Sequence, residues 1–245
     1  MIDRLLEVVR RQEPAVLFTV LEGDSVGRKL LVLESGERHG DGPAELAERA
    51  DELLRGGRSR LVELDGMRVF ADVYGPPPRL LVFGAIDTAE ALCASARQLG
   101  WRTIVADARG KFATPERIPS ADELIVAWPE EALAQVQPDH RTAIVVLTHD
   151  DKFDVPALQG ALETGAFYIG ALGSRRNQSR RRERLLEAGV EEAALDRISG
   201  PAGLDIGADS PAETAVSILA EVIATRAGRE GGRLRASTER IHVEV

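Results

Sequence analysis

Apolar side chains recur in short blocks along the second part of the chain, with polar residues between the blocks. Strands without polar alternation are covered on both faces of a sheet. A helix with apolar positions at helical spacing is expected over 88–99, and further helices at 129–136 and 154–164. This alternation of strands and helices predicts a parallel, doubly wound α/β sheet. The predicted strands are Leu80–Phe83, Thr103–Ala106, Leu124–Ala127, Ile144–Leu147 and Phe167–Ile169.

Two more helices complete this part. One is expected from about 174 to 187, after the strand at Phe167–Ile169. The last starts at a capping box, because Ser210 caps the helix, Pro211 takes its first position and Glu213 stands three residues after the cap. It is expected to run to about Arg226.

The first part of the chain has a different pattern of apolar and polar positions. A helix at 2–12, a helix at 44–55 and four strands, two of them joined in a hairpin at Asp65-Gly66, predict a small α+β domain. Three prolines at 76–78 form a short rigid linker. We therefore expect a small domain at 1–75, a Rossmann-like domain at 76–228 and a tail at 229–245. The predicted strands are 15–21, 29–33, 60–64 and 67–73.

Composition narrows the function classes. The net charge is −9, and an acidic chain repels polyanions such as nucleic acid and anionic membranes. No apolar run approaches the roughly 18 residues that span a bilayer, so we expect a cytoplasmic protein. The one cysteine, Cys93, excludes an intrachain disulfide and a cysteine-rich metal cluster. Its place on the apolar face of a predicted helix indicates a buried structural thiol, and no metal site is predicted.

The first strand ends in a partial dinucleotide fingerprint. Gly84 and Ala89 match its first and third glycine positions, but Ile86 stands at the second, where glycine lets a pyrophosphate approach the backbone. Asp107 ends the next strand, where a ribose-binding acid is usual. Gly84 and Asp107 are therefore cofactor-binding candidates. The alternative is that Gly84 only makes the turn and Asp107 only caps the next segment.

Two further loops carry candidate chemistry. Thr148-His149-Asp150-Asp151 follows a buried strand, where ligand sites gather in open α/β sheets. His149 is a candidate there, against the alternative of a solvated loop. The glycine loop that ends in Gly173-Ser174-Arg175-Arg176 enters a helix, whose free N–H groups and guanidinium side chains together favour an anion. The alternative for this loop is a basic face paired with Glu183 and Glu187.

These motifs resemble the XdhC/CoxI family over about Pro76 to Arg226. Its small N-terminal domain is divergent here, because the family's Cys-Leu-Glu is absent from Gly40–Glu45, and Ile86-Asp87 replaces the family's Gly-His. The matching stretches are Pro76–Leu80 with Phe83–Ala85, Val105–Arg109, Leu147–Asp150, Tyr168–Arg176, Gly203–Ala208 and Ala215–Glu221.

The resemblance implies an accessory protein rather than a catalyst. Such a protein transiently holds molybdenum cofactor, as molybdopterin or its dinucleotide form, and meets a cysteine desulfurase that supplies the sulfido ligand. It then delivers the product to an apo molybdenum hydroxylase of the xanthine-dehydrogenase type, and it is typically a homodimer. The match includes Asp205, which joins the cofactor-binding candidates. Two alternatives stay open: an NAD(P)-dependent oxidoreductase on the same fold, and a non-catalytic interaction module.

Overall fold

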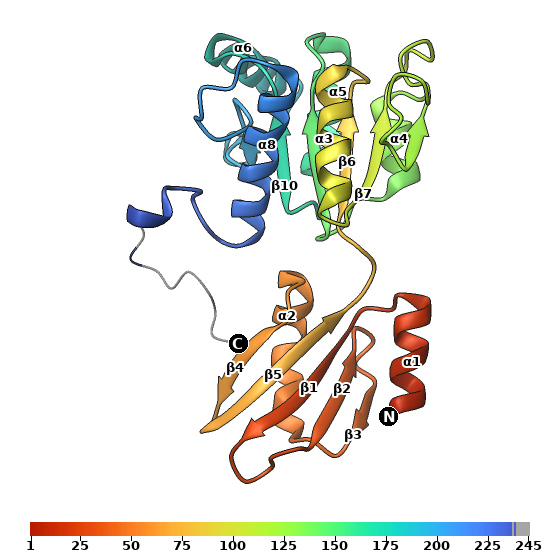
Figure 1. Ribbon diagram of the computed structural model, residues 1–245. Helices are drawn as coiled ribbons and strands as arrows, with labels where there is room; N and C mark the ends of the chain where they lie inside the picture. Colours follow the sequence, from red (N-terminus) through yellow and green to blue (C-terminus); the bar gives the residue numbers. More distant parts are fainter. Residues whose placement is uncertain (237, 239–245) are drawn as a thin grey trace. The chain divides into compact units, whose positions relative to one another are not determined.

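The computed structural model describes residues 1–236 and 238, which divide into two compact units (Figure 1). One unit comprises Met1–Pro76, with Gly232–Ala236 grouped with it, and the other comprises Pro77–Gly231. Of the predicted tail at 229–245, residues 237 and 239–245 lie outside the described residues. A short 3-10 helix, η2 (Leu234–Ala236), lies in the rest of it.

The first unit is a five-stranded antiparallel sheet in the order β3-β2-β1-β5-β4. Side chains of η1 and α2, among them Leu46 and Leu53, pack on one face of it. Val8 of α1 packs against Leu17 and Leu31 in a separate cluster. The elements are α1 (Ile2–Arg11), β1 (Ala15–Glu22), β2 (Lys29–Leu33), β3 (Arg38–Gly40), η1 (Ala44–Arg49), α2 (Ala50–Gly56), β4 (Arg60–Leu64) and β5 (Met67–Tyr74).

The single helix predicted at 44–55 was wrong in type over its first half. That half is the 3-10 helix η1, which begins with a bond from the Leu46 N–H to the Pro43 carbonyl, and only the second half is α-helix. Tight 3-10 turns are common at helix starts. The strand β3 was not predicted, because three residues are too few for a pattern, and it exists through its pairing with β2.

The second unit is a six-stranded sheet, parallel throughout, in the order β11-β10-β9-β6-β7-β8. This confirms the predicted doubly wound fold. The strands are β6 (Arg79–Phe83), β7 (Arg102–Ala106), β8 (Glu123–Ile125), β9 (Thr142–Val146), β10 (Tyr168–Ala171) and β11 (Ile198–Ser199). The helices are α3 (Asp87–Gln98), α4 (Pro129–Val136), α5 (Asp151–Leu162), α6 (Arg175–Glu187), α7 (Glu192–Leu195) and α8 (Pro211–Arg226).

Helices cover both faces of this sheet (Figure 1). Side chains of α3 and α8 pack on one face around Leu80 and Val82, and those of α4, α5 and α6 pack on the other around Leu81 and Phe83. The chain order reverses between β6 and β9, so the two halves of the sheet diverge there. Ligands of open α/β sheets bind at such a point, outside the carboxyl ends of the strands.

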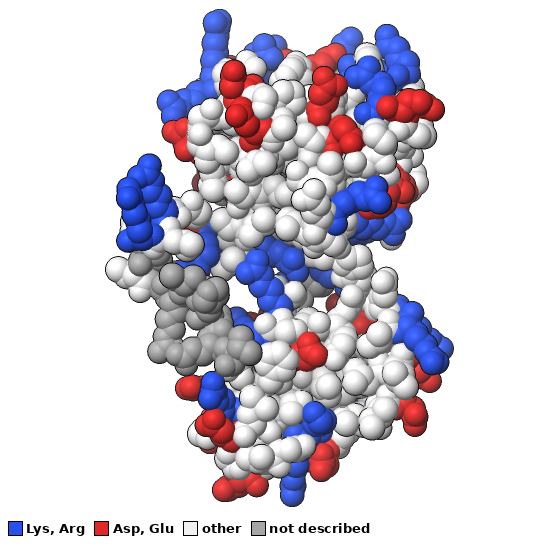
Figure 2. Space-filling model, in the orientation of Figure 1, with Lys and Arg blue, Asp and Glu red and all other residues white. Residues whose placement is uncertain are grey.

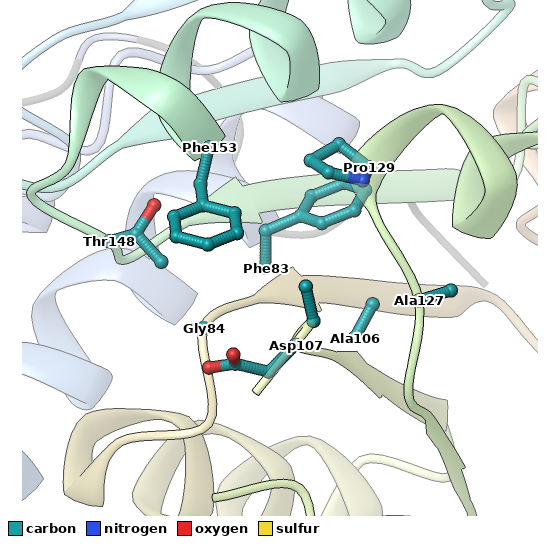
Figure 3. A pocket seen from close by; sticks show the side chains of 9 residues that line it. Phe83, Gly84, Ala106, Asp107, Ala127, Pro129, Thr148 and Phe153 are labelled. Carbon is teal, nitrogen blue, oxygen red and sulfur yellow. The ribbon is translucent and has the colours of Figure 1, made fainter. Parts of the chain in front are cut away.

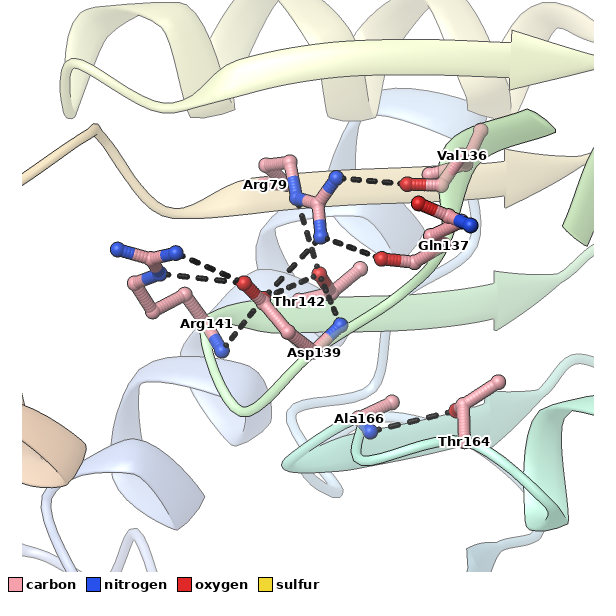
Figure 4. A network of polar contacts seen from close by, with 8 residues as sticks. All are labelled: Arg79, Val136, Gln137, Asp139, Arg141, Thr142, Thr164 and Ala166. Carbon is pink, nitrogen blue, oxygen red and sulfur yellow. Dashed lines mark hydrogen bonds and ion pairs between the residues drawn. The ribbon is translucent and has the colours of Figure 1, made fainter. Parts of the chain in front are cut away.

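A polar network holds the amino ends of β6 and β9 (Figure 4). Arg79 donates to the Val136 carbonyl at 2.8 Å and to the Gln137 carbonyl at 2.9 Å, so it satisfies carbonyls at the end of α4. It also lies 3.2 Å from Asp139. Burial alone raises the pKa of Asp139, but hydrogen bonds from Arg141 and the charge of Arg79 hold that pKa well below its usual value. The network fixes both central strands at the end opposite the switch point.

Several predicted boundaries need correction in this unit. The strand predicted at 124–127 ends at Ile125, and Val126 and Trp128 beyond it are 58% and 48% exposed. The helix predicted at 154–164 begins at Asp151, because Asp150 caps it by accepting from the Lys152 N–H. The capping box at Ser210 and Glu213 is confirmed. In the described part of the chain, no helix has the length and apolarity needed to cross a bilayer.

Cys93 lies fully buried on α3, within the core that α3 and α8 form on the sheet. Burial raises the pKa of its thiol to about 12, so the thiolate is not populated at neutral pH. We expect Cys93→Ala to lower the free energy of unfolding by about 1 kcal/mol, and to leave ligand binding nearly intact. Chemical denaturation beside a binding titration checks this. Lost binding in a stably folded variant would contradict the structural role of the thiol.

Candidate functional site

The residues predicted to bind a cofactor lie at one edge of the second unit. Each stands on a loop that follows a strand: Gly84 after β6, Asp107 after β7, His149 after β9, and Asp205 after β11. Gly173 to Arg176 follow β10 and enter α6. Because the strands are parallel, these loops open at the same carboxyl edge (Figure 1).

Gly84 brings two of these loops together at the switch point. Its φ of +105° lies in the region that favours glycine. A side chain there would place its Cβ 2.8 Å from Thr148 Cγ2 and 3.3 Å from the Thr148 nitrogen. The Gly84 N–H already donates to the Ala106 carbonyl at 2.9 Å. Gly84 therefore allows close packing of the loops after β6 and β9, and its N–H is not free for a phosphate.

The Asp107 carboxylate is buried and fully engaged by neighbouring donors. It accepts from the Ala85 N–H at 3.0 Å, and Arg109 grips both of its oxygens with Nε at 2.9 Å and Nη2 at 2.8 Å. Burial alone raises the pKa of Asp107, but these hydrogen bonds outweigh burial and lower it. Asp107 thus holds the loop after β6 in place and orients Arg109. Both of its oxygens accept hydrogen bonds from within the protein.

A small pocket opens between these groups (Figure 3). Gly84 and Asp107 form one side of it and Thr148 and Phe153 another. The enclosed space admits about one water molecule, so the pocket is too small to enclose a larger ligand. The full lining is Phe83, Gly84, Ala106, Asp107, Ala108, Ala127, Pro129, Thr148 and Phe153.

The His149 loop presents a single imidazole beside two carboxylates that are engaged elsewhere. His149 is exposed, Asp150 caps α5, and Asp151 pairs with Arg180 and Arg184 on α6. No group of three or more His, Cys, Asp or Glu side chains among the described residues converges as metal ligands do. His149 therefore stands alone at the edge of the switch point, available to a ligand.

The start of α6 presents free donors to solvent. Ser174 caps the helix by accepting from the Asn177 N–H at 3.3 Å, and Gly173 before it has a φ of +137°. The N–H groups of Arg175 and Arg176 have no acceptor inside the helix. Both side chains are exposed and form no hydrogen bond or ion pair with the described residues. Helix N–H groups, helix dipole and two unpaired guanidinium groups together favour an anion.

Arg181 differs from the other arginines of α6. Its side chain is only 6% exposed, and it binds Asp154 of α5, itself 2% exposed, at 2.7 Å. It also donates to the Leu172 carbonyl at 3.1 Å, while Asp154 accepts from the Thr148 hydroxyl. The pair therefore joins the loop that carries His149 to the loop that carries Ser174.

This pair was missed by the sequence analysis, although a signal existed. Asp154 precedes Ala157, Leu158 and Ala161 by three, four and seven residues, so it belongs to the apolar face of α5. An acid on a buried face requires a cationic partner. The partner itself lies 27 residues away, and α6 offers several arginines.

The loop before α8 is anchored while Asp205 is free. The Gly203 N–H donates to Glu221 at 2.7 Å, and Ser217 donates to the Leu204 carbonyl at 2.6 Å. A Cβ on Gly203 would lie 2.4 Å from Ser217 Oγ, so the close approach requires glycine. Asp205 is exposed at the tip of the loop. A lone carboxylate suits a hydrogen-bond donor of a ligand better than its phosphate.

Comparison with known families matches residues 80–222 to the XdhC Rossmann domain. That range is more than half of the chain. The chain belongs to the XdhC family. The match contains the loops after β6, β7, β9 and β10 and the start of α8. Asp205 lies inside it as well. The resemblance inferred from the sequence is thereby confirmed.

Three curated relatives align with this XdhC-family chain. A Bacillus subtilis protein, named as a probable xanthine dehydrogenase subunit, is 38% identical over 64% of the chain and 46% of its own length. The uncharacterized protein YqeB of Escherichia coli is 34% identical over 68% of the chain and 30% of its own length. The molybdenum cofactor insertion chaperone PaoD of Escherichia coli is 31% identical over 64% of the chain and 43% of its own length. The aligned part is thus less than half of each relative.

A solved structure resembles this chain over nearly its whole length. It is a crystal structure described as a xanthine dehydrogenase from Bacillus halodurans, with a TM-score of 0.57 and 22% sequence identity. The alignment covers 96% of this chain and 97% of that one. At this identity the likeness supports the fold.

Proposed function

We propose that this protein is a maturation factor that transiently binds the molybdenum cofactor and assists its insertion into a molybdenum hydroxylase. The observation that supports this proposal most strongly is the geometry at the start of α6. Two exposed, unpaired arginines stand on the first turn of a helix in a chain of net charge −9. The free N–H groups of a helix start beside two unpaired guanidinium groups favour an anionic ligand. The names of two relatives, an insertion chaperone and a probable xanthine dehydrogenase component, support the choice of anion.

The residues present fit the phosphate of such a cargo. The free N–H groups of the first α6 turn and the forks of Arg175 and Arg176 bind phosphate oxygens, and Ser174 fixes the helix start. Gly173 lets the backbone turn tightly before these donors. We assign His149 and Asp205 to polar groups of the cargo further along the edge. Gly84 and Asp107 act as positioning residues, because their own polar groups are already engaged.

The partners follow from the proposed role. An apo molybdenum hydroxylase receives the cargo, a cysteine desulfurase supplies its sulfido ligand, and the protein acts as a homodimer. Charge on the visible face of the second unit is mixed, with acidic and basic side chains interspersed (Figure 2). Such a surface suits protein partners better than nucleic acid.

Native mass spectrometry with metal analysis tests the proposed function. The protein is isolated after co-expression with a molybdenum-cofactor pathway, and retained pterin and molybdenum are measured together. We expect a bound mass equal to the cofactor and stoichiometric molybdenum. If the isolated protein carries neither pterin nor molybdenum, the result contradicts the proposal and favours a non-catalytic interaction module.

The residues at the start of α3 oppose the binding of a nicotinamide dinucleotide. Ile86 stands at the start of α3 with an extended φ of −118°, and its side chain packs against the core where a dinucleotide fingerprint has glycine. Asp87 beside it is exposed and places a negative charge at the helix start. We expect weak or no NAD(P) binding by calorimetric titration. A low-micromolar Kd would instead support the oxidoreductase alternative.

A further inference from the structure

The segment between β11 and α8 lies along α8 and is tied to it at several points. We call residues 203–210 the strap. In its middle, the Leu204 N–H donates to the Ser217 carbonyl at 3.2 Å, and the Ser217 hydroxyl donates back to the Leu204 carbonyl at 2.6 Å. At its end, two N–H groups donate to Glu213 at 3.0 and 2.9 Å. Residues 205–208 between these ties are exposed, so the tip of the strap is open to a ligand.

The start of the strap is held by a single carboxylate oxygen of α8. Glu221 Oε2 accepts from the Gly203 N–H at 2.7 Å and from the Tyr168 hydroxyl at 2.5 Å. Tyr168 is 3% exposed, and burial together with the Glu221 carboxylate raises the pKa of its phenol, so the hydroxyl stays protonated and donates. Hydrogen bonds to a carboxylate are stronger than those between neutral groups. Tyr168 therefore fixes the side chain that fixes the strap.

Gly170 lets the Tyr168 hydroxyl reach toward the carboxyl end of β10. The two residues are two positions apart on this strand, so they share one face of the sheet. A Cβ on Gly170 would lie 2.5 Å from the Tyr168 hydroxyl oxygen and 2.6 Å from its Cε1. The phenol ring thus occupies the space that a side chain at 170 would take. A tyrosine at the first position of the strand thereby carries its hydroxyl toward the end where ligands bind.

The strap and the start of α6 are attached to the same point of the sheet. The Ala202 N–H, directly before the strap, donates to the Ala171 carbonyl at 3.0 Å. Gln178 of α6 donates to the same carbonyl at 2.9 Å. Ala171 is the last residue of β10, and the loop that follows it leads to Ser174 and α6. The strap therefore begins beside the strand end from which the candidate anion site emerges.

We propose that Glu221 and Tyr168 are positioning residues that hold Asp205 against the ligand bound at the start of α6. The inference rests on the proposed function and adds an element of specificity to it. A carboxylate accepts hydrogen bonds only, so Asp205 selects N–H or O–H groups of the ligand while the α6 start binds its phosphate. Glu221 acts through the strap, because its Oε2 is engaged by two donors within the protein.

The test measures cofactor binding and the exchange of strap amides on the full-length chain. Wild type, Glu221→Ala and Glu221→Gln are titrated with molybdenum cofactor, and hydrogen exchange of the Gly203 amide is followed without ligand. We expect Glu221→Ala to weaken binding about tenfold and to speed the exchange, because a lost hydrogen-bond partner changes an equilibrium by about that factor. Glu221→Gln keeps an accepting oxygen and should stay within about threefold of wild type.

Tyr168→Phe removes only the hydroxyl and should give a smaller change in the same direction. Its matched control is Tyr74→Phe, because Tyr74 also donates to a carboxylate, Asp72 at 2.7 Å, but in the first unit. The control should leave cofactor binding and the exchange of the Gly203 amide unchanged. Equal effects of the two tyrosine variants would contradict a role of Tyr168 in placing the strap.

A double-mutant cycle with Asp205→Ala separates positioning from a general loss of stability. If Glu221 acts through Asp205, Asp205→Ala/Glu221→Ala binds about as weakly as Asp205→Ala alone. Losses that add, or binding or exchange unchanged in Glu221→Ala, overturn this inference and leave the proposed function intact, because wild type still binds. Failure of wild type to bind molybdenum cofactor overturns both proposals together.

Discussion

Replacing Arg175 and Arg176 together by alanine is expected to weaken binding of the molybdenum cofactor by about two to four powers of ten. Charge-assisted hydrogen bonds contribute about 1.5–3 kcal/mol each, and two additive contributions convert to that range of Kd. Both side chains are exposed and unpaired within the described structure, so their removal hardly changes folding. Calorimetric titration beside a thermal melt measures both effects.

The matched control is the double variant Arg180→Ala/Arg184→Ala. These arginines lie on the same helix, are 54% and 52% exposed, and already pair with Asp151. The control removes the same formal charge from α6 but leaves its first turn intact. We expect less than a tenfold loss from it. If both double variants lose affinity equally, the effect is one of net charge and the assignment of the phosphate to the α6 start is wrong.

The largest effect on stability is expected from the buried pair of Asp154 and Arg181. Replacing Arg181 by methionine leaves a buried carboxylate without its cation, and such a change costs about 3–5 kcal/mol of unfolding free energy. Chemical denaturation measures it. The ion pair also joins the loops at Thr148 and Leu172, so residual folded protein should bind cofactor more weakly.

A second variant separates charge burial from packing. Asp154→Leu/Arg181→Met replaces both charges by apolar side chains and should recover most of the lost stability, because no unpaired charge remains. Arg180→Ala is the exposed counterpart on the same helix and should cost less than about 1 kcal/mol. If Arg181→Met is as stable as Arg180→Ala, water reaches the Asp154 carboxylate and the pair does not act as a buried one.

Local pattern was sufficient for most elements of the second unit, although not for the short helix α7. Continuous apolar blocks identified β6, β7, β9 and most of β10, because a strand covered on both faces leaves no room for polar alternation. Strands β11 and β3 were not predicted, because two or three residues are too few to show a periodic pattern of apolar positions. The late start predicted for α5 came from treating Asp150 as loop chemistry instead of a helix cap.

The candidate site was likewise predictable in part from the sequence and in part only from the folded structure. Loops after strands are found from the chain alone, and the parallel sheet then brings Gly84, His149 and Arg175 to one edge. The chain alone does not reveal which polar groups are already engaged. Asp107 looked free to bind a ribose, but the donors that occupy it come from Ala85 and Arg109 in the folded unit.

By itself the sequence determined the fold class, the family and the loops that carry polar chemistry, because these depend on periodicity and on short motifs. Only the tertiary structure decided which arginine of α6 is buried and which ring stacks on Phe153. Asp154 and Arg181 are 27 residues apart, and Trp128 precedes α4 whereas Phe153 belongs to α5. Such partners are chosen by how helices pack on the sheet, and the energy of burying a charge or a ring depends on that packing.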